Sequence, residues 1–298
     1  MLSKTEFAVL SCLEKNTQKL TQRQIKELCG FSLGTSNKVY NELTKSGFIA
    51  DSMITEAGLA ALEPYRVKRA IFLSAGFGSR LIPITLNTPK PLVRVHGVRM
   101  IDTLLDAVVR ANIPEIYIVR GYLSEQFDIL LKKYPKIKFI ENNMFNETNN
   151  ISSAYLVRNL ISGSYVMEAD LVLSNPDLIT KYQYKSNYLG VPTKVTDDWC
   201  FQTHGTRITQ LSVGGVNCYH MFGISYWTVP DGEKLASHLE MVFHSPGGKE
   251  RYWDQVPLEY FIKDYNIDVR ICSFEDIVEI DTFSDLKIID KTYEISKC

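Results

Sequence analysis

The 298-residue sequence predicts an α/β protein with a mostly parallel, doubly wound sheet and a strand-rich insertion, preceded by a small α-rich domain. From about residue 67, short apolar runs alternate with helical patterns in the order β-α-β-α-β, which is typical of parallel sheets. After about residue 186 the pattern becomes irregular and rich in strands, whereas the first 66 residues have helical periodicity. We therefore expect two domains, residues 1–66 and 67–298.

Residues 1–66 predict helices followed by a short hairpin and a final helix. Thr21 and Gln24 form a capping box that opens the second helix. A hairpin is expected over 47–54. The apolar face of the first helix is formed by Phe7, Leu10 and Leu13.

This order of elements resembles the winged helix-turn-helix domains of the MarR kind. The resemblance makes residues 33–46 a candidate DNA-recognition helix, whose exposed side chains would be Thr35, Ser36, Asn37 and Lys38. The alternative is a docking or dimerisation domain, and the charges favour it. Residues 1–63 have seven Lys and Arg side chains against seven Asp and Glu, so they form no basic field.

The larger predicted domain begins with a buried strand and alternates strands with helices. Its expected strands lie at 70–73, 116–119, 138–140 and 165–168, and its expected helices at 100–111, 124–134 and 152–159. The insertion reads as strands at 188–195, 208–213 and 220–226. The chain then returns to strands at 269–272 and 278–281 and closes with a helix from Ser284.

Composition excludes several classes of protein. The net charge is −1, so no global field would hold the chain on nucleic acid or on an anionic membrane. No run of 18 apolar residues occurs, and no secretory signal pattern opens the sequence, so we expect a cytoplasmic protein with no membrane partner. The cysteines show no metal-binding spacing and fit packing roles in a reduced protein: Cys12, Cys29, Cys200, Cys218, Cys272 and Cys298.

The loop after the first strand of this domain is the most informative segment. It opens with Gly76 and Gly78, but Leu81 occupies the third-glycine position, so the dinucleotide-binding fingerprint fails. The two glycines still let backbone N–H groups approach a phosphate chain. Arg80 and Lys90 add positive charge to the same loop. Long loops after sheet strands are usually functional.

From Gly76 to Lys90 the sequence resembles the sugar-phosphate nucleotidylyltransferase superfamily, whose signature is a Gly-x-Gly-Ser/Thr-Arg-Leu run followed by Pro and Lys. Within it, the chain resembles bacterial choline-phosphate cytidylyltransferases of the LicC type over about residues 67–290. The matching segments include 120–122, 125–127, 149–152, 168–170, 223–227, 252–257 and 278–281. The resemblance implies a nucleotidyltransferase sheet and transfer of CMP from CTP to phosphocholine, giving CDP-choline and pyrophosphate.

The resemblance also implies the site residues. Asp170 and Asp281 match the family's Mg²⁺ ligands, and both follow predicted strands. Arg80 and Lys90 are assigned to the triphosphate as catalytic residues. The nucleotide-binding residues implied by the resemblance are Ala75, Gly76, Gly78, Ser79, Gly121, Tyr122 and Ser152.

A quaternary ammonium has no N–H, so aromatic faces and carboxylates must hold it. The expected choline cage consists of Trp199, Tyr226, Trp253, Asp254 and Glu279. Phosphoethanolamine, 2-aminoethylphosphonate or a sugar phosphate are alternative acceptors, and a primary ammonium would want more acceptors and fewer aromatics. A transcription regulator with a ligand-sensing nucleotidyltransferase-like domain is the alternative of another class. A homodimer is left open.

Overall fold

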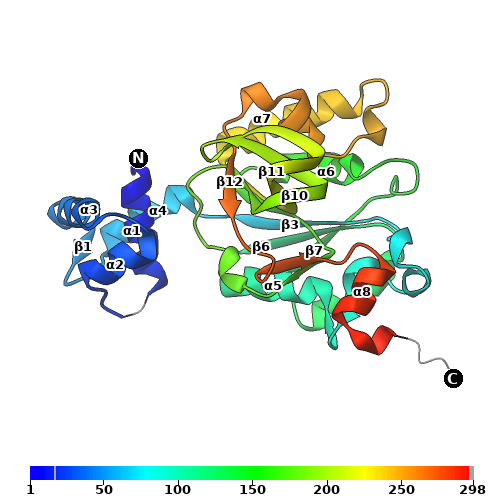
Figure 1. Cartoon of the computed structure of the whole chain (residues 1–298), viewed down its shortest axis with the longest axis horizontal. Coiled ribbons are helices and arrows are strands. Elements are labelled where there is room, and N and C mark those ends of the chain that lie inside the picture. Colours follow the sequence, from blue (N-terminus) through cyan, green and yellow to red (C-terminus); the bar gives the residue numbers. More distant parts are fainter. Residues whose placement is uncertain (17, 295–298) are drawn as a thin grey trace. The chain divides into compact units, whose positions relative to one another are not determined.

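The computed structural model describes residues 1–16 and 18–294, and the chain divides into two compact units (Figure 1). Unit 1 consists of Met1–Arg66 together with Tyr182–Tyr184. Unit 2 consists of Val67–Lys181 and the chain from Lys185 onward. The predicted packing residue Cys298 lies outside the described residues.

Unit 1 has three helices, a short antiparallel hairpin and a fourth helix. The Thr21–Gln24 capping box is confirmed, because the Thr21 side chain accepts from the Gln24 N–H while the Gln24 side chain accepts from the Thr21 N–H. The elements are α1 (Lys4–Lys15), α2 (Gln22–Cys29), α3 (Leu33–Lys45), β1 (Ile49–Ala50), β2 (Met53–Ile54) and α4 (Glu56–Leu62).

The candidate recognition helix α3 differs from expectation in exposure: of the four side chains expected to be exposed, Lys38 is exposed, Thr35 and Asn37 are half-buried, and Ser36 is buried. Ser36 is buried at 1% exposure, because it lies on the same face of the helix as Val39 and Leu43, which pack in the core of unit 1. Lys38 and Asn41 are exposed. Ser36 therefore drops out of the set of side chains predicted to face a DNA groove.

A short segment from far along the chain completes unit 1. The rings of Phe7, Tyr65 and Tyr184 lie with centroids 5.1 to 5.5 Å apart. The Tyr65 and Tyr184 hydroxyls both donate to the Leu2 carbonyl. Tyr182 packs in the same core. Unit 1 is therefore not built from the first 66 residues alone.

Unit 2 is built on a seven-stranded sheet in the order β10-β12-β11-β8-β3-β6-β7. Strands β8, β3, β6 and β7 run parallel, and β11 joins β8 antiparallel. The strands are β3 (Arg69–Ser74), β6 (Glu115–Arg120), β7 (Ile137–Glu141), β8 (Ser164–Glu168), β10 (Asn187–His204), β11 (Arg207–Trp227) and β12 (Asp268–Ile271). Two smaller pairs are β4 (Arg94–Val95) with β5 (Val98–Arg99), and β9 (Leu171–Leu173) with β13 (Ile277–Glu279).

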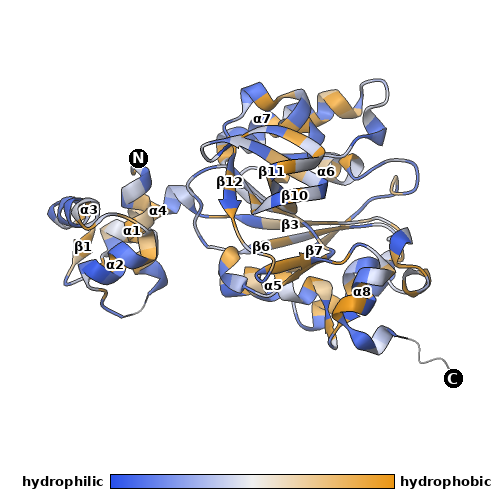
Figure 2. Cartoon of the chain, in the orientation of Figure 1, coloured by the Kyte–Doolittle hydropathy of each residue, from blue (hydrophilic) through white to orange (hydrophobic). Residues whose placement is uncertain are grey.

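Helices cover both faces of this sheet. Figure 1 shows α6 (Ile151–Val157) and α7 (Val229–Phe243) on one side, and α5 (Met100–Arg110) and α8 (Phe283–Ile289) on the other. Figure 2 shows apolar residues along the inner strand β6 and mixed apolar and polar colouring on the covering helices. Two buried clusters lie on opposite faces of the sheet, one containing Phe72 and Leu105, the other Ile71 and Leu239. The predicted α/β class and mostly parallel sheet are confirmed.

Some elements differ in kind or length from the prediction. Ser124–Lys132 is a 3-10 helix rather than an α-helix, with i to i−3 bonds such as Gln126 N–H to the Leu123 carbonyl. The insertion forms one long ribbon of β10 and β11 with several register shifts, because its strands run on through bulges that the sequence pattern reads as breaks. Helix α7 was not foreseen.

Among the described residues, no helix combines the length and the apolarity that crossing a membrane requires.

Candidate active site

The loop after β3 folds back over the carboxyl edge of the sheet. Gly78 has φ +62, and a Cβ there would lie 2.8 Å from the Lys90 Cβ, so only glycine permits this approach. The Thr85 hydroxyl donates to the Gly78 carbonyl at 2.8 Å and fixes the turn. The two ends of the predicted signature are thereby brought together.

Lys90 is a buried cation held between two carboxylates. Its Nζ lies 2.7 Å from Asp170 Oδ2 and 3.2 Å from Asp281 Oδ1. Asp170 follows β8 and Asp281 follows β13, and the Ile280 N–H donates to the Asp170 carbonyl, so the small β9–β13 pair aligns them. Burial lowers the pKa of Lys90, but the attraction of Asp170 and Asp281 outweighs it and raises the pKa above the usual value.

Arg80 extends this network outward. Its guanidinium forms an ion pair with Asp281 while its side chain stays largely exposed. A long, exposed cation beside a buried one provides two positive charges at the same edge of the sheet. The predicted pairing of Arg80 and Lys90 in one site thus agrees with the geometry.

Three carboxylates converge close to Lys90. One oxygen each of Asp170, Glu279 and Asp281 lies within 4.8 Å of the others. Asp170 Oδ1 is buried and lacks a hydrogen-bond partner among the described residues. Hard oxygen donors with one unpartnered atom fit a divalent cation such as Mg²⁺. Sequence reasoning placed Glu279 in the choline cage, and the structure brings it into this acidic cluster as well.

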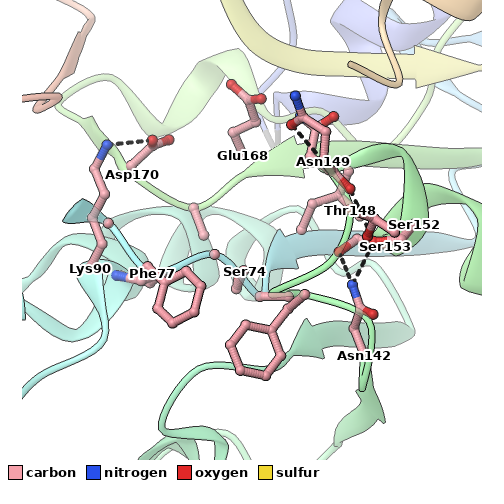
Figure 3. A pocket seen from close by; sticks show the side chains of 18 of the residues that line it. Ser74, Phe77, Lys90, Asn142, Thr148, Asn149, Ser152, Ser153, Glu168 and Asp170 are labelled. Atoms are coloured by element: carbon pink, nitrogen blue, oxygen red, sulfur yellow. Dashed lines mark hydrogen bonds and ion pairs between the residues drawn. The ribbon is translucent and has the colours of Figure 1, made fainter. Parts of the chain in front are cut away.

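A cavity of about 330 Å³ opens between the signature loop and the segment 142–153. Seven of the predicted residues line it: Ala75, Gly76, Gly78, Arg80, Lys90, Ser152 and Asp170. Figure 3 shows Lys90 and Asp170 at one end and Asn142, Ser152 and Ser153 at the other. The cavity is therefore charged at one end and neutral and polar at the other.

Three predicted nucleotide-binding residues do not line this cavity. Tyr122 supports the loop from behind, since its N–H donates to the Ala75 carbonyl at 3.1 Å and its hydroxyl donates to the Thr85 carbonyl at 2.9 Å. A Cβ on Gly121 would lie 2.8 Å from the ring of Phe145, which does line the cavity. Ser79 opens a 3-10 turn outside it. Tyr122 and Gly121 therefore affect the cavity indirectly, Tyr122 by holding the signature loop and Gly121 by leaving room for Phe145.

The neutral end contains a hydrogen-bond network that sequence reasoning missed apart from Ser152. Asn142 is 2% exposed, and its Nδ2 donates to Ser152 Oγ at 2.9 Å and to Ser153 Oγ at 3.0 Å. Asn142 Oδ1 accepts from the Met144 N–H, which fixes the orientation of the amide. Asn142 follows β7 at the carboxyl edge of the sheet, and that position was the available signal.

A second cavity of about 160 Å³ shares Arg80, Glu168, Asp170 and Tyr252 with the first. Of the predicted cage, Trp199, Asp254 and Glu279 line it. Tyr252 is an added aromatic wall, with its ring centroid 5.6 Å from that of Trp199. Other residues not foreseen here are Glu168, Asp198, Met221, Gly223 and Gln255.

Two predicted cage residues lie in the core instead. Tyr226 is 3% exposed and packs edge to face on Tyr165, on the α5 side of the sheet. Trp253 is 1% exposed and stacks on Tyr188 in the opposite core. Neighbouring residues of a strand point to opposite faces of the sheet. Both faces of β11 are covered near Tyr226, so its ring is buried in the core and does not reach the cavity. The cage prediction was wrong in placing these two rings.

The second cavity is strongly acidic. Burial raises the pKa of Asp254 to about 7, although Tyr188 donates to its Oδ1 at 2.8 Å. Burial, and then repulsion from Asp170, raises the pKa of Glu279 to about 8 and that of Glu168 well above its usual value. A Cβ on Gly223 would lie 2.2 Å from Glu168 Oε2, so this glycine makes room for the carboxylate. Such crowding of carboxylates favours a positively charged ligand.

Comparison with known proteins agrees with this geometry. The model of the family described as nucleotidyl transferase matches residues 69–189. A 2-aminoethylphosphonate cytidylyltransferase of Lancefieldella rimae is 34% identical over 228 residues, 75% of this chain and 92% of that protein. A choline-phosphate cytidylyltransferase of Haemophilus influenzae is 34% identical over 223 residues, 72% of this chain and 93% of that protein.

Solved structures give the same result. The CTP:phosphocholine cytidylyltransferase of Streptococcus pneumoniae superposes with a TM-score of 0.70 at 30% identity, covering 76% of this chain and 99% of that chain. An inositol-1-phosphate CTP transferase of T. maritima, at 16% identity and a TM-score of 0.61, shares the fold. At the carboxyl edge of the sheet, the structure brings together the signature loop, Arg80 and Lys90, and the acidic cluster. The chain belongs to the nucleotidyl transferase family and is a nucleotidyltransferase.

Proposed function

We propose that the protein transfers CMP from CTP to phosphocholine, forming CDP-choline and releasing pyrophosphate. Its relatives support cytidylyl transfer as the reaction, since proteins that are 31–34% identical over 72–75% of this chain are cytidylyltransferases. The acceptor is the finer part of the proposal. The observation that carries it is the acidic cavity, with Trp199 and Tyr252 beside Asp254, which adjoins the cavity containing Lys90.

The reaction needs electrostatic help more than proton transfer. A phosphomonoester oxygen is already anionic near neutral pH, so it attacks the α-phosphorus without a general base. Lys90 and Arg80 would offset the charge of the triphosphate and of the departing pyrophosphate. Asp170, Asp281 and Glu279 would hold Mg²⁺, which supplies further positive charge to the phosphates when bound.

A trimethylammonium head has no N–H to donate, so it is bound by ring faces and by nearby negative charge. Trp199 and Tyr252 form an edge-to-face pair in the acidic cavity, and Asp254 and Glu168 supply carboxylates there. Because Arg80, Glu168, Asp170 and Tyr252 line both cavities, the phosphate of such an acceptor would lie towards the nucleotide.

2-Aminoethylphosphonate is the second candidate acceptor. Two aromatic rings line the acidic cavity, whereas the predicted cage had three. Six carboxylate residues line it: Glu168, Asp170, Asp198, Asp254, Glu279 and Asp281. A primary ammonium donates up to three hydrogen bonds, so it gains more from carboxylates than from rings. The Lancefieldella rimae relative uses this compound by name.

The test is pyrophosphate release from CTP with Mg²⁺, comparing phosphocholine, phosphoethanolamine, 2-aminoethylphosphonate and glucose 1-phosphate. Asp170→Ala serves as the blank, and omission of Mg²⁺ should abolish turnover. The expected result is the highest kcat/KM for phosphocholine. A preference for 2-aminoethylphosphonate would replace the acceptor and keep the reaction, whereas turnover of none would overturn both.

For unit 1 we propose, separately, an interaction module. Lys38 and Asn41 are exposed on α3, but positive and negative side chains balance over residues 1–63. A gel shift with the DNA upstream of the gene, with and without CTP and phosphocholine, tests the DNA-binding hypothesis. Salt-sensitive binding that Lys38→Ala weakens would favour it, and no binding would favour protein contacts.

A further inference from the structure

The neutral end of the nucleotide cavity is the part of the site whose chemistry the proposed reaction has not used. It lies at the opposite end from Lys90 and Asp170, as Figure 3 shows. Since the cationic end would take the phosphates, the base of a nucleotide would reach this neutral end. Its polar side chains are therefore candidates for reading the base.

Within residues 1–16 and 18–294, the two serine hydroxyls here are in different states. Ser152 Oγ accepts from Asn142 Nδ2 and donates to the Asn149 carbonyl at 3.0 Å, so its hydrogen is already used. Ser153 Oγ accepts from Asn142 Nδ2 at 3.0 Å and makes no other hydrogen bond. Ser153 is 3% exposed and lines the cavity, so its hydroxyl hydrogen is available to a group bound there.

Asn142 determines which way the Ser153 hydroxyl points. Its amide cannot turn over, because Oδ1 accepts from the Met144 N–H at 2.9 Å. Both Nδ2 hydrogens are directed at the serine oxygens, one to each. The Ser153 hydrogen must then point away from Asn142, and Ser153 lines the cavity. The amide thus makes Ser153 a hydrogen-bond donor towards a ligand.

We propose that Ser153 is the base-reading residue that selects cytosine over uracil, with Asn142 as its positioning residue. N3 of cytosine is an acceptor and matches a donated hydroxyl, whereas N3 of uracil carries a hydrogen. With uracil, the Ser153 hydroxyl can accept from N3–H only if it turns, and its own hydrogen then has no partner. If it does not turn, the N3 hydrogen has none, and either unpaired buried group weakens binding. The inference rests on the proposed use of CTP and names the origin of its specificity.

The decisive variant is Asn142→Asp. A carboxylate oxygen in place of Nδ2 can only accept, so the serine hydroxyls would turn to donate to it, while the Met144 N–H keeps its acceptor. Ser153 would then present lone pairs to the base. We expect the ratio of kcat/KM for CTP to that for UTP to fall by about tenfold or more, which corresponds to one exchanged buried hydrogen bond. This ratio responds to base reading and not to a general loss of activity.

Two serine variants complete the experiment with the same acceptor and pyrophosphate assay. Ser153→Ala should lower kcat/KM for CTP and bring the ratio towards one. Ser245→Ala is the control, because this exposed serine lies outside both cavities and its hydroxyl donates to the Val242 carbonyl, and it should leave the ratio within about twofold. If Asn142→Asp fails to fold, Ser153→Ala still decides the matter.

The outcomes separate the two proposals. Wild-type protein that prefers CTP, with the preference lost in Ser153→Ala, supports the inference. A preference that survives in both Ser153→Ala and Asn142→Asp would overturn it and leave the proposed reaction intact. Wild-type protein that uses CTP and UTP equally would also overturn it alone, whereas turnover of neither nucleotide would overturn both.

Discussion

The two adjoining cavities of unit 2 differ in how they are built. The nucleotide cavity is lined mainly by the signature loop and by the segment 142–153, and its positive charge comes from Lys90 and Arg80. The acidic cavity is assembled from β8, β10, β11, β13 and the segment after α7, and its charge comes from carboxylates. A local motif therefore specifies much of the first cavity, whereas the second depends throughout on tertiary packing.

The contrast in charge has a functional meaning. Cations gather where phosphates would bind, and carboxylates gather where the cationic head of the acceptor would bind. Asp170 lies in both cavities and contacts Lys90, so the two regions of opposite charge meet at one ion pair. Variants that affect one cavity, the other or their junction should consequently differ in kinetic signature.

The largest effect is expected at the junction. Lys90→Ala removes the buried cation that contacts Asp170 and Asp281, so kcat for pyrophosphate release should fall by about a thousandfold. Lys138→Ala is the matched control, because that lysine is exposed on β7 beside Glu115 and Tyr117. Full activity of Lys90→Ala would contradict its assignment to the triphosphate.

A charge change confined to the acidic cavity should separate the two substrates. Asp254→Asn keeps an oxygen to accept from Tyr188 and loses the negative charge. We expect KM for phosphocholine to rise by about thirtyfold, and KM for CTP to stay within about twofold. Asp264→Asn, at an exposed aspartate, is the control. Equal changes in both KM values would argue against a cation site at Asp254.

Removing an aromatic ring should distinguish cavity from core. Trp199→Ala should raise KM for phosphocholine by about tenfold with little loss of stability, because the indole lines the acidic cavity. Tyr226→Leu should leave KM unchanged and lower the free energy of unfolding by about 2 kcal/mol, since its ring packs on Tyr165. Chemical denaturation and initial rates on the same preparations check both. The reverse pattern would restore Tyr226 to the cage.

The difference between the nucleotide cavity and the acidic cavity also explains which site residues could be predicted from the sequence. The order of strands and helices and the residues Gly76, Gly78, Arg80 and Lys90 follow from local pattern and from a signature of fixed spacing. Asp170 and Asp281 were also predicted together, because both match the metal ligands of the family that the sequence resembles, and the structure brings them together.

Burial of aromatic residues could not be read in the same way. Trp253 lies between Tyr252 and Asp254, which line the acidic cavity, and Tyr226 follows Gly223 by three residues. Both rings nevertheless point into a core that only the folded sheet creates. Asn142 was missed because a single asparagine after a strand has the same sequence signal as a turn residue.

The smallest expected effect is a pH dependence of stability and of choline binding between pH 6 and 8, a range in which choline itself does not titrate. The pKa of Asp254 is raised to about 7 by burial, with Glu168, Glu279 and Asp170 near it and Tyr188 donating to it. A carboxyl whose pKa is higher in the folded state stabilises the protein at low pH, and this stabilisation is lost as pH rises through about 7. Between pH 6 and 8 the ligand-free protein should therefore lose stability.

Choline binding should change in the opposite direction, because the ionised carboxylate attracts the cation. The rise in melting temperature produced by choline should be larger at pH 8 than at pH 6, with the apparent Kd lower by several-fold, up to about tenfold. Asp254→Asn should flatten this dependence, since its amide does not titrate. If the variant kept the full pH dependence of the wild type, the titrating group would be another carboxyl of the acidic cavity. Glu279 would then be the candidate, and it would have to be assigned to cation binding rather than to the metal-binding cluster.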